Sequence, residues 1–129
     1  MIIELPWPPK ELSQNARIHW AVRAKAVKSY RNTCYALARI KAIKIDWDGP
    51  IHFFIDFYPP DRRRYDDDGV SGRFKYGRDG IAQALGVDDN RFVQHPYLHP
   101  ASYAVKGGKV VVRISAIITE TDTALICCV

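Results

Sequence analysis

The pattern of apolar residues predicts β-strands in three parts of the chain. Residues 2–5 form a short, mostly apolar stretch that ends at Pro6, whose missing backbone N–H stops a strand. From Ile51 to Tyr58 apolar residues recur at every second position, which is typical of a strand with one buried face. Near the C-terminus, residues 101–106 and 109–118 flank two adjacent glycines, and this arrangement favours a tight hairpin.

Residues 18–42 predict a long amphipathic helix. Its apolar side chains recur at intervals of three and four, as on one face of a helix. They are Val27, Tyr30, Cys34 and Leu37. Basic side chains fall on the other side, at Lys25, Lys28 and Arg39. This basic face has two readings, a surface that binds a polyanion or an ordinary solvated helix face.

A second helix is predicted from about Val70 to Leu85, with Asp68 as its expected N-cap. Phe74 and Ile81 lie on the same helical stripe as these two apolar residues. Three glycines weaken the prediction, because each costs about 1 kcal/mol against alanine in a helix interior. They are Gly72, Gly77 and Gly80.

The predicted order of elements is β-α-β-α-β-β with a C-terminal hairpin, and a turn with a short extended stretch precedes the last two strands. This order indicates an α/β (or α+β) domain with a small mixed sheet. With 129 residues, 47% of them hydrophobic, the chain has the size of one globular domain. We expect that domain to cover residues 1–119, with residues 120–129 as a tail.

The chain has neither a basic, apolar leader nor an apolar run long enough to span a membrane, so we expect a soluble, intracellular (cytoplasmic) protein. Its three cysteines are odd in number, and two of them are adjacent, at Cys127 and Cys128. Neither a disulfide framework nor a C-x-x-C zinc site has that spacing. We therefore expect reduced thiols.

Acidic residues gather in one part of the chain. Asp66, Asp67 and Asp68 are consecutive, and the pair Asp88-Asp89 follows about twenty residues later. In extended backbone the first and third aspartates of the run would project from the same side and the middle one would point away. A divalent cation would relieve the repulsion between them. We read the two remaining aspartates, at positions 67 and 88, as solvated neighbours of such a site.

Basic residues around the acids point to a partner that is itself a polyanion. The net charge is +5, and three arginines directly precede the acidic run. Metal and polyphosphate together suggest a nuclease. The arginines can hold phosphates near the cut or be a solvated run that balances the acids. Four further cations are candidates for contacts to the arms of the DNA. The full set of candidate DNA-binding residues is Arg62, Arg63, Arg64, Lys10, Arg17, Lys25 and Lys28.

Other sites fit the residues less well. An EF-hand loop would place Arg64 and Lys75 where carboxylates are needed. His95 and His99 are four residues apart, but the prolines beside them forbid the helix that would align a zinc pair. No phosphate-binding G-x-x-x-x-G-K-[ST] pattern is present, so we expect no nucleotide cofactor. Trp7, Trp20 and Tyr65 could stack on unpaired bases, although the two tryptophans fit a core equally well.

Several stretches together resemble the RusA family of Holliday-junction resolvases, also called crossover junction endodeoxyribonucleases. The resemblance rests on Leu5-Pro6-Trp7-Pro8-Pro9, on Pro60-Asp61-Arg62-Arg63-Arg64-Tyr65-Asp66-Asp67-Asp68, on the spacing of Lys75 and Asp79, on Asp79-Gly80-Ile81-Ala82-Gln83-Ala84-Leu85, and on Gly86-Val87-Asp88-Asp89. It covers nearly all of the chain up to about Ile118, and the central acidic block is its specific part.

The resemblance implies an intertwined α/β homodimer that resolves four-way DNA junctions in recombination and repair, with Mg²⁺ held by aspartates. Asp66 and Asp68 match the alternating metal-binding aspartates of the family, Asp89 matches the acting residue of its downstream pair, and Lys75 matches its helical basic residue. Two departures exist. Gly69 stands where the family usually has asparagine, and the interval from Asp68 to Lys75 is a few residues longer.

The chemistry also fits the residues themselves. Mg²⁺ prefers oxygen ligands and usually takes one or two carboxylates together with waters and phosphate oxygens, so Asp66, Asp68 and Asp89 are a plausible metal site; Mn²⁺ is a possible substitute. Lys75 would neutralise charge on the phosphorane or orient the nucleophile. Its alternative role is an ordinary salt bridge with Asp79 one helical turn away.

A helix over residues 70–85 is about 24 Å long, which separates Asp89 from Asp66 and Asp68. Either the chain folds back along the helix, or a two-fold partner supplies Asp89 to a shared site. We expect a homodimer in both cases. Two alternatives to a junction resolvase stay open, a branched-DNA-binding protein without catalysis and a metal-dependent nuclease of other branched or flap DNA.

Overall fold

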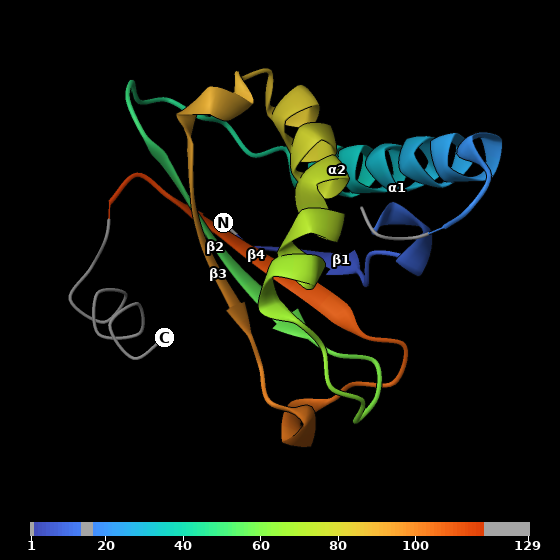
Figure 1. Cartoon of the computed structure of the whole chain (residues 1–129). Coiled ribbons are helices and arrows are strands. Elements are labelled where there is room, and N and C mark those ends of the chain that lie inside the picture. The colour runs from blue at the N-terminus through green and yellow to red at the C-terminus, as the bar shows by residue number, and fades with distance from the viewer. Residues whose placement is uncertain (1, 14–16, 118–129) are drawn as a thin grey trace.

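The computed structural model describes residues 2–13 and 17–117. Within them four strands and two long helices follow one another, with three short 3₁₀ helices between them (Figure 1). The strands and helices are β1 (Ile2–Pro6), α1 (Trp20–Lys41), β2 (Ile51–Tyr58), α2 (Asp67–Leu85), β3 (Phe92–Leu98) and β4 (Lys109–Ser115). The 3₁₀ helices are η1 (Lys10–Leu12), η2 (Asp89–Arg91) and η3 (Ala101–Tyr103).

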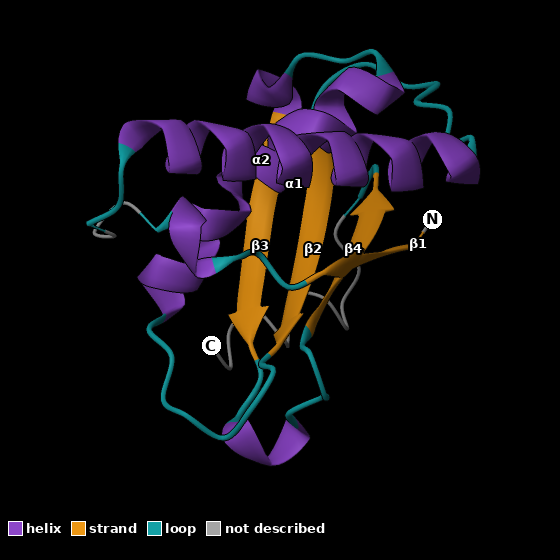
Figure 2. Cartoon of the chain, turned by 90° about the vertical axis from the view of Figure 1, so that its right-hand side faces the viewer, coloured by secondary structure: helices purple, strands orange, loops and turns teal. Residues whose placement is uncertain are grey.

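The strands form one mixed sheet in the order β1-β4-β2-β3. β2 and β3 are parallel neighbours connected by α2, whereas β4 runs antiparallel to both β1 and β2. Figure 2 shows α1 and α2 in front of the strands, so both helices cover the same face of the sheet. The predicted class is confirmed at this level: a small α/β (α+β) domain with a mixed sheet.

The predicted C-terminal hairpin is wrong. Residues 101–103 form η3 instead of a strand, and β4 pairs with β1 and β2, which lie far away in the sequence. The two glycines do make a turn, because Gly107 and Gly108 have φ angles of 80° and 71°. The turn leads from η3 into β4, so glycines alone do not identify the partner of the strand that follows them.

β3 forms where the sequence suggested only a short extended stretch. Pro96 lies inside it and pairs in register with Ile55 of β2. Proline has no backbone N–H to donate to a ladder and is therefore confined to edge strands. β3 is one of the two edge strands of the sheet, so its outer side has no neighbouring strand to which a backbone N–H would donate.

The core lies between the sheet and the two helices and follows the predicted stripes. Ile51, Phe53, Ile55 and Phe57 of β2 are each at most 2% exposed. Tyr30 and Cys34 of α1 and Val70, Phe74 and Ile81 of α2 are buried as well. Burial raises the pKa of the Cys34 thiol to about 12. Leu12 in η1 is fully buried as well.

Glycines let α1 and α2 cross closely. A Cβ atom on Gly80 would lie 2.4 Å from the backbone oxygen of Arg31 in α1, and one on Gly77 would lie 2.9 Å from rings of Phe74 and Tyr30. By contrast, a Cβ on Gly72 would meet nothing within 4 Å. Two of the three glycines that weaken the helix prediction are therefore the residues on which the helix packing depends.

The C-cap residue of α1, Ala42, allows a test of backbone strain. Ala42 has a φ angle of 49°, the left-handed conformation, and its N–H donates to the Arg39 oxygen at 3.1 Å. This conformation costs a residue with a Cβ atom about 1–2 kcal/mol. Replacing it by glycine removes that cost but lowers stability by about 0.4–1 kcal/mol, because glycine increases the conformational entropy of the unfolded chain. We expect Ala42→Gly to stabilise the protein by up to about 1 kcal/mol in urea unfolding. Ala36→Gly, in the middle of α1, should instead cost about 1 kcal/mol, and equal losses in both variants would contradict this account.

Some predictions fall on residues that the structure does not describe. The tail at 120–129, the cysteines at 127 and 128, and the end of the last predicted strand lie outside the described residues. Within residues 2–13 and 17–117, no helix is both long and apolar enough to cross a membrane.

Candidate functional site

The carboxyl ends of β2 and β3 lie at the same edge of the sheet because the two strands are parallel neighbours. The loop that follows β2 carries the three arginines, and the segment that follows β3 begins with His99. Between them lies a pocket of about 280 Å³ lined by Arg62, Arg63, Arg64, Tyr65 and His99 among others. The three arginines therefore follow the carboxyl end of β2 and line a pocket at this edge of the sheet.

A second pocket, of about 450 Å³, adjoins the first through residues 63–65. We call it the Asp66 pocket because this aspartate is its one acidic lining residue. Its other charged lining residues are Lys10, Arg63, Arg64 and Arg73, and Trp7 and Tyr65 supply aromatic surface. A single carboxylate thus faces four cations, a composition suited to an anionic ligand.

Hydrogen bonds fix the loop between the two pockets. Asp61 accepts hydrogen bonds from the Arg63 backbone N–H at 2.9 Å and from its guanidinium at 2.8 and 3.1 Å. The Tyr65 hydroxyl donates to the same carboxylate at 3.1 Å. The side-chain bond from Arg63 is the main reason why the pKa of Asp61 falls to about 2. Asp61 therefore holds Arg63 in place, although Arg63 is exposed like Arg62 and Arg64 beside it.

The acidic run begins α2, and its conformation differs from the prediction. Asp66 occupies the N-cap position that was expected for Asp68, although its side chain makes no capping hydrogen bond, and α2 starts at Asp67. Asp67 and Asp68 are therefore in the first helical turn, so the alternating, extended arrangement of the run is wrong. All three side chains are exposed, and their charges are favourable at the positive end of the helix dipole.

Gly69 lies directly beside Asp66, since a Cβ atom there would be 3.6 Å from a carboxylate oxygen of Asp66. That distance is an ordinary van der Waals contact, so the position would tolerate a side chain. The glycine leaves the Asp66 carboxylate open on this side.

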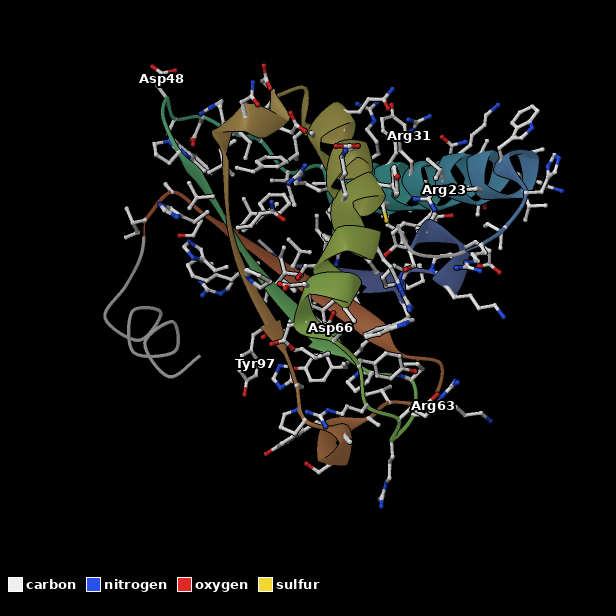
Figure 3. All side chains as sticks on the ribbon, viewed as in Figure 1. Arg23, Arg31, Asp48, Arg63, Asp66 and Tyr97 are labelled. Carbon is white, nitrogen blue, oxygen red and sulfur yellow. The ribbon has the colours of Figure 1, made fainter. Side chains whose placement is uncertain are left out.

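The downstream acids lie at the opposite end of α2 from Asp66. Figure 1 shows η2 beside the C-terminal end of α2, and Figure 3 shows Asp66 at the other end of this helix, near the loop of Arg63. Asp89 forms an ion pair with Arg78 at 3.8 Å. Asp88 accepts a hydrogen bond from the Asn90 N–H at 2.9 Å and so caps η2.

Asp79 and Asp89 lie close enough for their carboxyl groups to hydrogen-bond. Desolvation is the main cause that raises the pKa of Asp79, and the negative charge and hydrogen bond of Asp89 add to the rise. The positive charges of Arg78 and Lys75 oppose it. The carboxylates of Asp79 and Asp89 are thus neighbours. From the sequence, Asp79 was considered only as a salt-bridge partner of Lys75.

The raised pKa of Asp79 predicts a pH dependence of stability. A carboxyl group whose folded pKa is raised binds more protons in the folded state than in the unfolded state, so its contribution to stability falls as pH rises through the two pKa values. We expect Asp79→Asn to be more stable than the wild type at pH 7 and to lose this advantage below about pH 4, where Asp79 is protonated in both states. Urea unfolding at both pH values measures the effect. A larger advantage at low pH would contradict the assigned direction.

The four predicted catalytic residues thus divide into two groups within one chain. Asp66 and Asp68 lie at the start of α2, whereas the charges of Lys75, in the middle of α2, and of Asp89 both influence Asp79. Asp89 reaches back along α2 as far as Arg78, which is twelve residues and about 18 Å along the helix from Asp66, so one chain does not bring Asp89 to Asp66. Among residues 2–13 and 17–117, no three His, Cys, Asp or Glu side chains lie close enough together to hold a metal ion.

The predicted DNA-binding residues also divide. Those that line the two pockets are Lys10, Arg62, Arg63 and Arg64. The others are exposed but line neither pocket: Arg17 precedes α1, and Lys25 and Lys28 are on α1 itself.

The aromatic residues and histidines have local partners. Trp7 packs edge-on against Phe57 and Tyr65, whereas Trp20 is 75% exposed and is no core residue. His95 lies 3.1 Å from His52 (Nε2 to Nδ1), and His99 lies 3.1 Å from the Asp56 carboxylate. The two histidines that were considered as a zinc pair therefore have separate partners.

Arg73 is a residue of the Asp66 pocket that sequence reasoning missed. The available signal was its interval of seven residues from Asp66, about two helical turns, which places both on one side of α2. It was obscured because the helix was expected to begin only at about Val70, which hides the shared side of the two residues.

Comparison with known proteins gives a relative but no described activity. No family model matches the chain. A protein of Xylella fastidiosa, described as an uncharacterized protein, is 45% identical to the chain over 123 residues, which are 93% of this chain and 79% of the relative.

Proposed function

We propose that this chain, which belongs to the same protein family as the uncharacterized Xylella fastidiosa protein, is a Mg²⁺-dependent endonuclease that cuts four-way DNA junctions. The observation that carries the proposal is the Asp66 pocket, in which one carboxylate at a helix start faces four cations. A carboxylate can hold a divalent cation, and the surrounding cations can hold the phosphates of a DNA strand. The four-way junction as substrate is inferred from the resemblance of the sequence to the RusA family.

The residues at the start of α2 fit Mg²⁺ by their chemistry. Asp66 and Asp68 offer exposed carboxylates, and Mg²⁺ usually takes one or two of these in a protein and completes its shell with water and phosphate oxygens. When bound, the ion would supply an activated water and neutralise charge that develops at the phosphorus. Lys10, Arg63 and Arg64 would hold the strand beside the acids.

Asp89 would reach such a site from a second copy of the chain. Within one chain it pairs with Arg78, which follows Asp66 by twelve residues, about 18 Å along α2. A two-fold axis perpendicular to α2, passing near its middle, would place the C-terminal end of one α2 beside the N-terminal end of the other. The homodimer would then contain two equivalent sites, as the symmetric cutting of two strands of a junction requires.

The function is tested by a cleavage assay on synthetic four-way junctions with Mg²⁺, with Mn²⁺ and with a chelator. Cutting of two opposed strands that depends on the metal supports the proposal. Tight binding without cutting under every divalent metal would refute the enzyme and leave a protein that binds branched DNA. This second candidate function is favoured by one observation: within the described residues of a single chain, no three His, Cys, Asp or Glu side chains could together hold a metal ion. Greater activity on flap substrates would point to a nuclease of other branched DNA.

The shared site is tested by mixing two inactive variants. Asp66→Asn and Asp89→Asn chains each lack one kind of carboxylate, but a mixed dimer would contain one site with both wild-type aspartates if the copies share sites. We therefore expect partial recovery of nicking in the mixture, with each variant alone as control. If each chain builds its own site, every site stays defective and the mixture remains inactive.

A further inference from the structure

Arg73 and Asp66 occupy the same side of α2, and Lys75 does not. Arg73 follows Asp66 by seven residues, about two turns, and Lys75 follows it by nine, about two and a half turns. Helical side chains lean toward the N-terminus, so the long arginine side chain reaches back toward Asp66. Both residues line the Asp66 pocket. The helical cation that accompanies Asp66 in its own chain is therefore Arg73.

The Nε atom of Arg73 is buried and has no hydrogen-bond partner among the described residues. Arg73 and Tyr65 both line the Asp66 pocket. Burial and the hydrogen bond to Asp61 raise the pKa of the Tyr65 hydroxyl, and the charges of Arg63 and Arg73 counteract that rise. A buried donor without an acceptor is costly, and a ligand that supplies one would be favoured.

The other cations of the Asp66 pocket favour an anion as that ligand. Arg63 is already paired with Asp61, at 2.8 Å. Lys10, Arg64 and Arg73 are left to face Asp66. Phosphate oxygens match a guanidinium especially well because its planar fork can donate two parallel hydrogen bonds.

We propose that Arg73 binds a phosphate group of the DNA strand held in the Asp66 pocket and so contributes to the affinity for that strand. The inference rests on the proposed function in that the ligand is DNA, but it does not require cutting. Arg73 acts in this assignment as a binding residue, and Lys75, on the opposite side of α2, interacts with the charge of Asp79.

Binding of a fluorescent four-way junction in the presence of Ca²⁺, at several salt concentrations, tests this inference. Arg73→Gln should weaken binding about tenfold and lower the slope of log affinity against log salt by about one, as expected for one lost phosphate contact. Arg39→Gln is the matched control, since it makes the same change at an exposed position of α1 outside both pockets. It should change affinity by less than about twofold.

Cutting with Mg²⁺ separates binding from chemistry. At saturating junction Arg73→Gln should cut within a few-fold of the wild type, so that KM rises and kcat is nearly retained. If Arg73→Gln does not fold, Arg73→Lys replaces it. Lysine keeps the charge but lacks the planar fork, and should also bind more weakly than the wild type.

The two proposals fail in different ways. An Arg73→Gln variant that binds as the wild type does, or no more weakly than Arg39→Gln, overturns the Arg73 assignment while wild-type cutting upholds the nuclease. A wild type that never cuts, but whose junction affinity falls with Arg73→Gln and not with Arg39→Gln, overturns the nuclease and supports the Arg73 assignment. A wild type that binds no DNA overturns both.

Discussion

Asp66→Asn should abolish junction cutting, with a loss of at least about 100-fold, and leave junction binding as tight as in the wild type or tighter. The lower bound follows from metal sites in which loss of a mere supporting residue costs about 10–100-fold in metal affinity or activity. Binding should not suffer because the substitution removes the one negative charge among the cations of the pocket. Single-turnover cutting with Mg²⁺ and anisotropy with Ca²⁺ measure the two quantities.

Asp67→Asn is the charge-matched control. Asp67 is the next residue, equally exposed, in the first turn of α2, but it lines neither pocket. We expect it to cut within a few-fold of the wild type. Unchanged cutting by Asp66→Asn, or an equal loss in both variants, would mean that the run only adjusts the surface potential.

The sequence predicted those parts of the fold that depend on local periodicity. Alternation in Ile51–Tyr58 and the stripe of Tyr30 and Cys34 identified β2 and α1, since each pattern reports which face is buried. β4 was assigned the wrong partner because strand pairing depends on residues remote in sequence, and its partners β1 and β2 come long before it. Pro96 obscured β3, as a proline is admissible only when a strand lies at an edge.

The candidate site was predictable in composition but not in assembly. The arginines and Asp66 were named as candidates from their charges, and they line the pockets that follow β2 and β3. Helix length alone indicated that Asp89 would lie far from Asp66. The sequence could not identify Arg73, because the side of α2 on which a residue falls depends on where the helix begins, and Asp66 rather than Asp68 is the N-cap.

The glycines of α2 show most clearly how tertiary contacts override local propensity. Propensity counts Gly80 as a defect in a helix, yet a side chain there would collide with the backbone of α1 at Arg31, which Figure 3 labels on α1 near its crossing with α2. The missing Cβ is what allows the two helices to approach. Gly72, in the same helix, meets nothing within 4 Å and is therefore an ordinary helix glycine.

Gly80→Ala should consequently destabilise the protein relative to Gly72→Ala by about 1–3 kcal/mol, the usual cost of overpacking. Both variants gain the same helix propensity of about 1 kcal/mol, so the difference between them isolates the contact with Arg31. Urea midpoints with unchanged slopes measure it, and Gly72→Ala should by itself be more stable than the wild type. Equal midpoints for the two variants would mean that α1 moves away from α2 at no cost. The close crossing would then contribute little to stability, and the geometry of α2 that places Asp66 and Arg73 on one pocket would have to be held by the sheet and η1 instead.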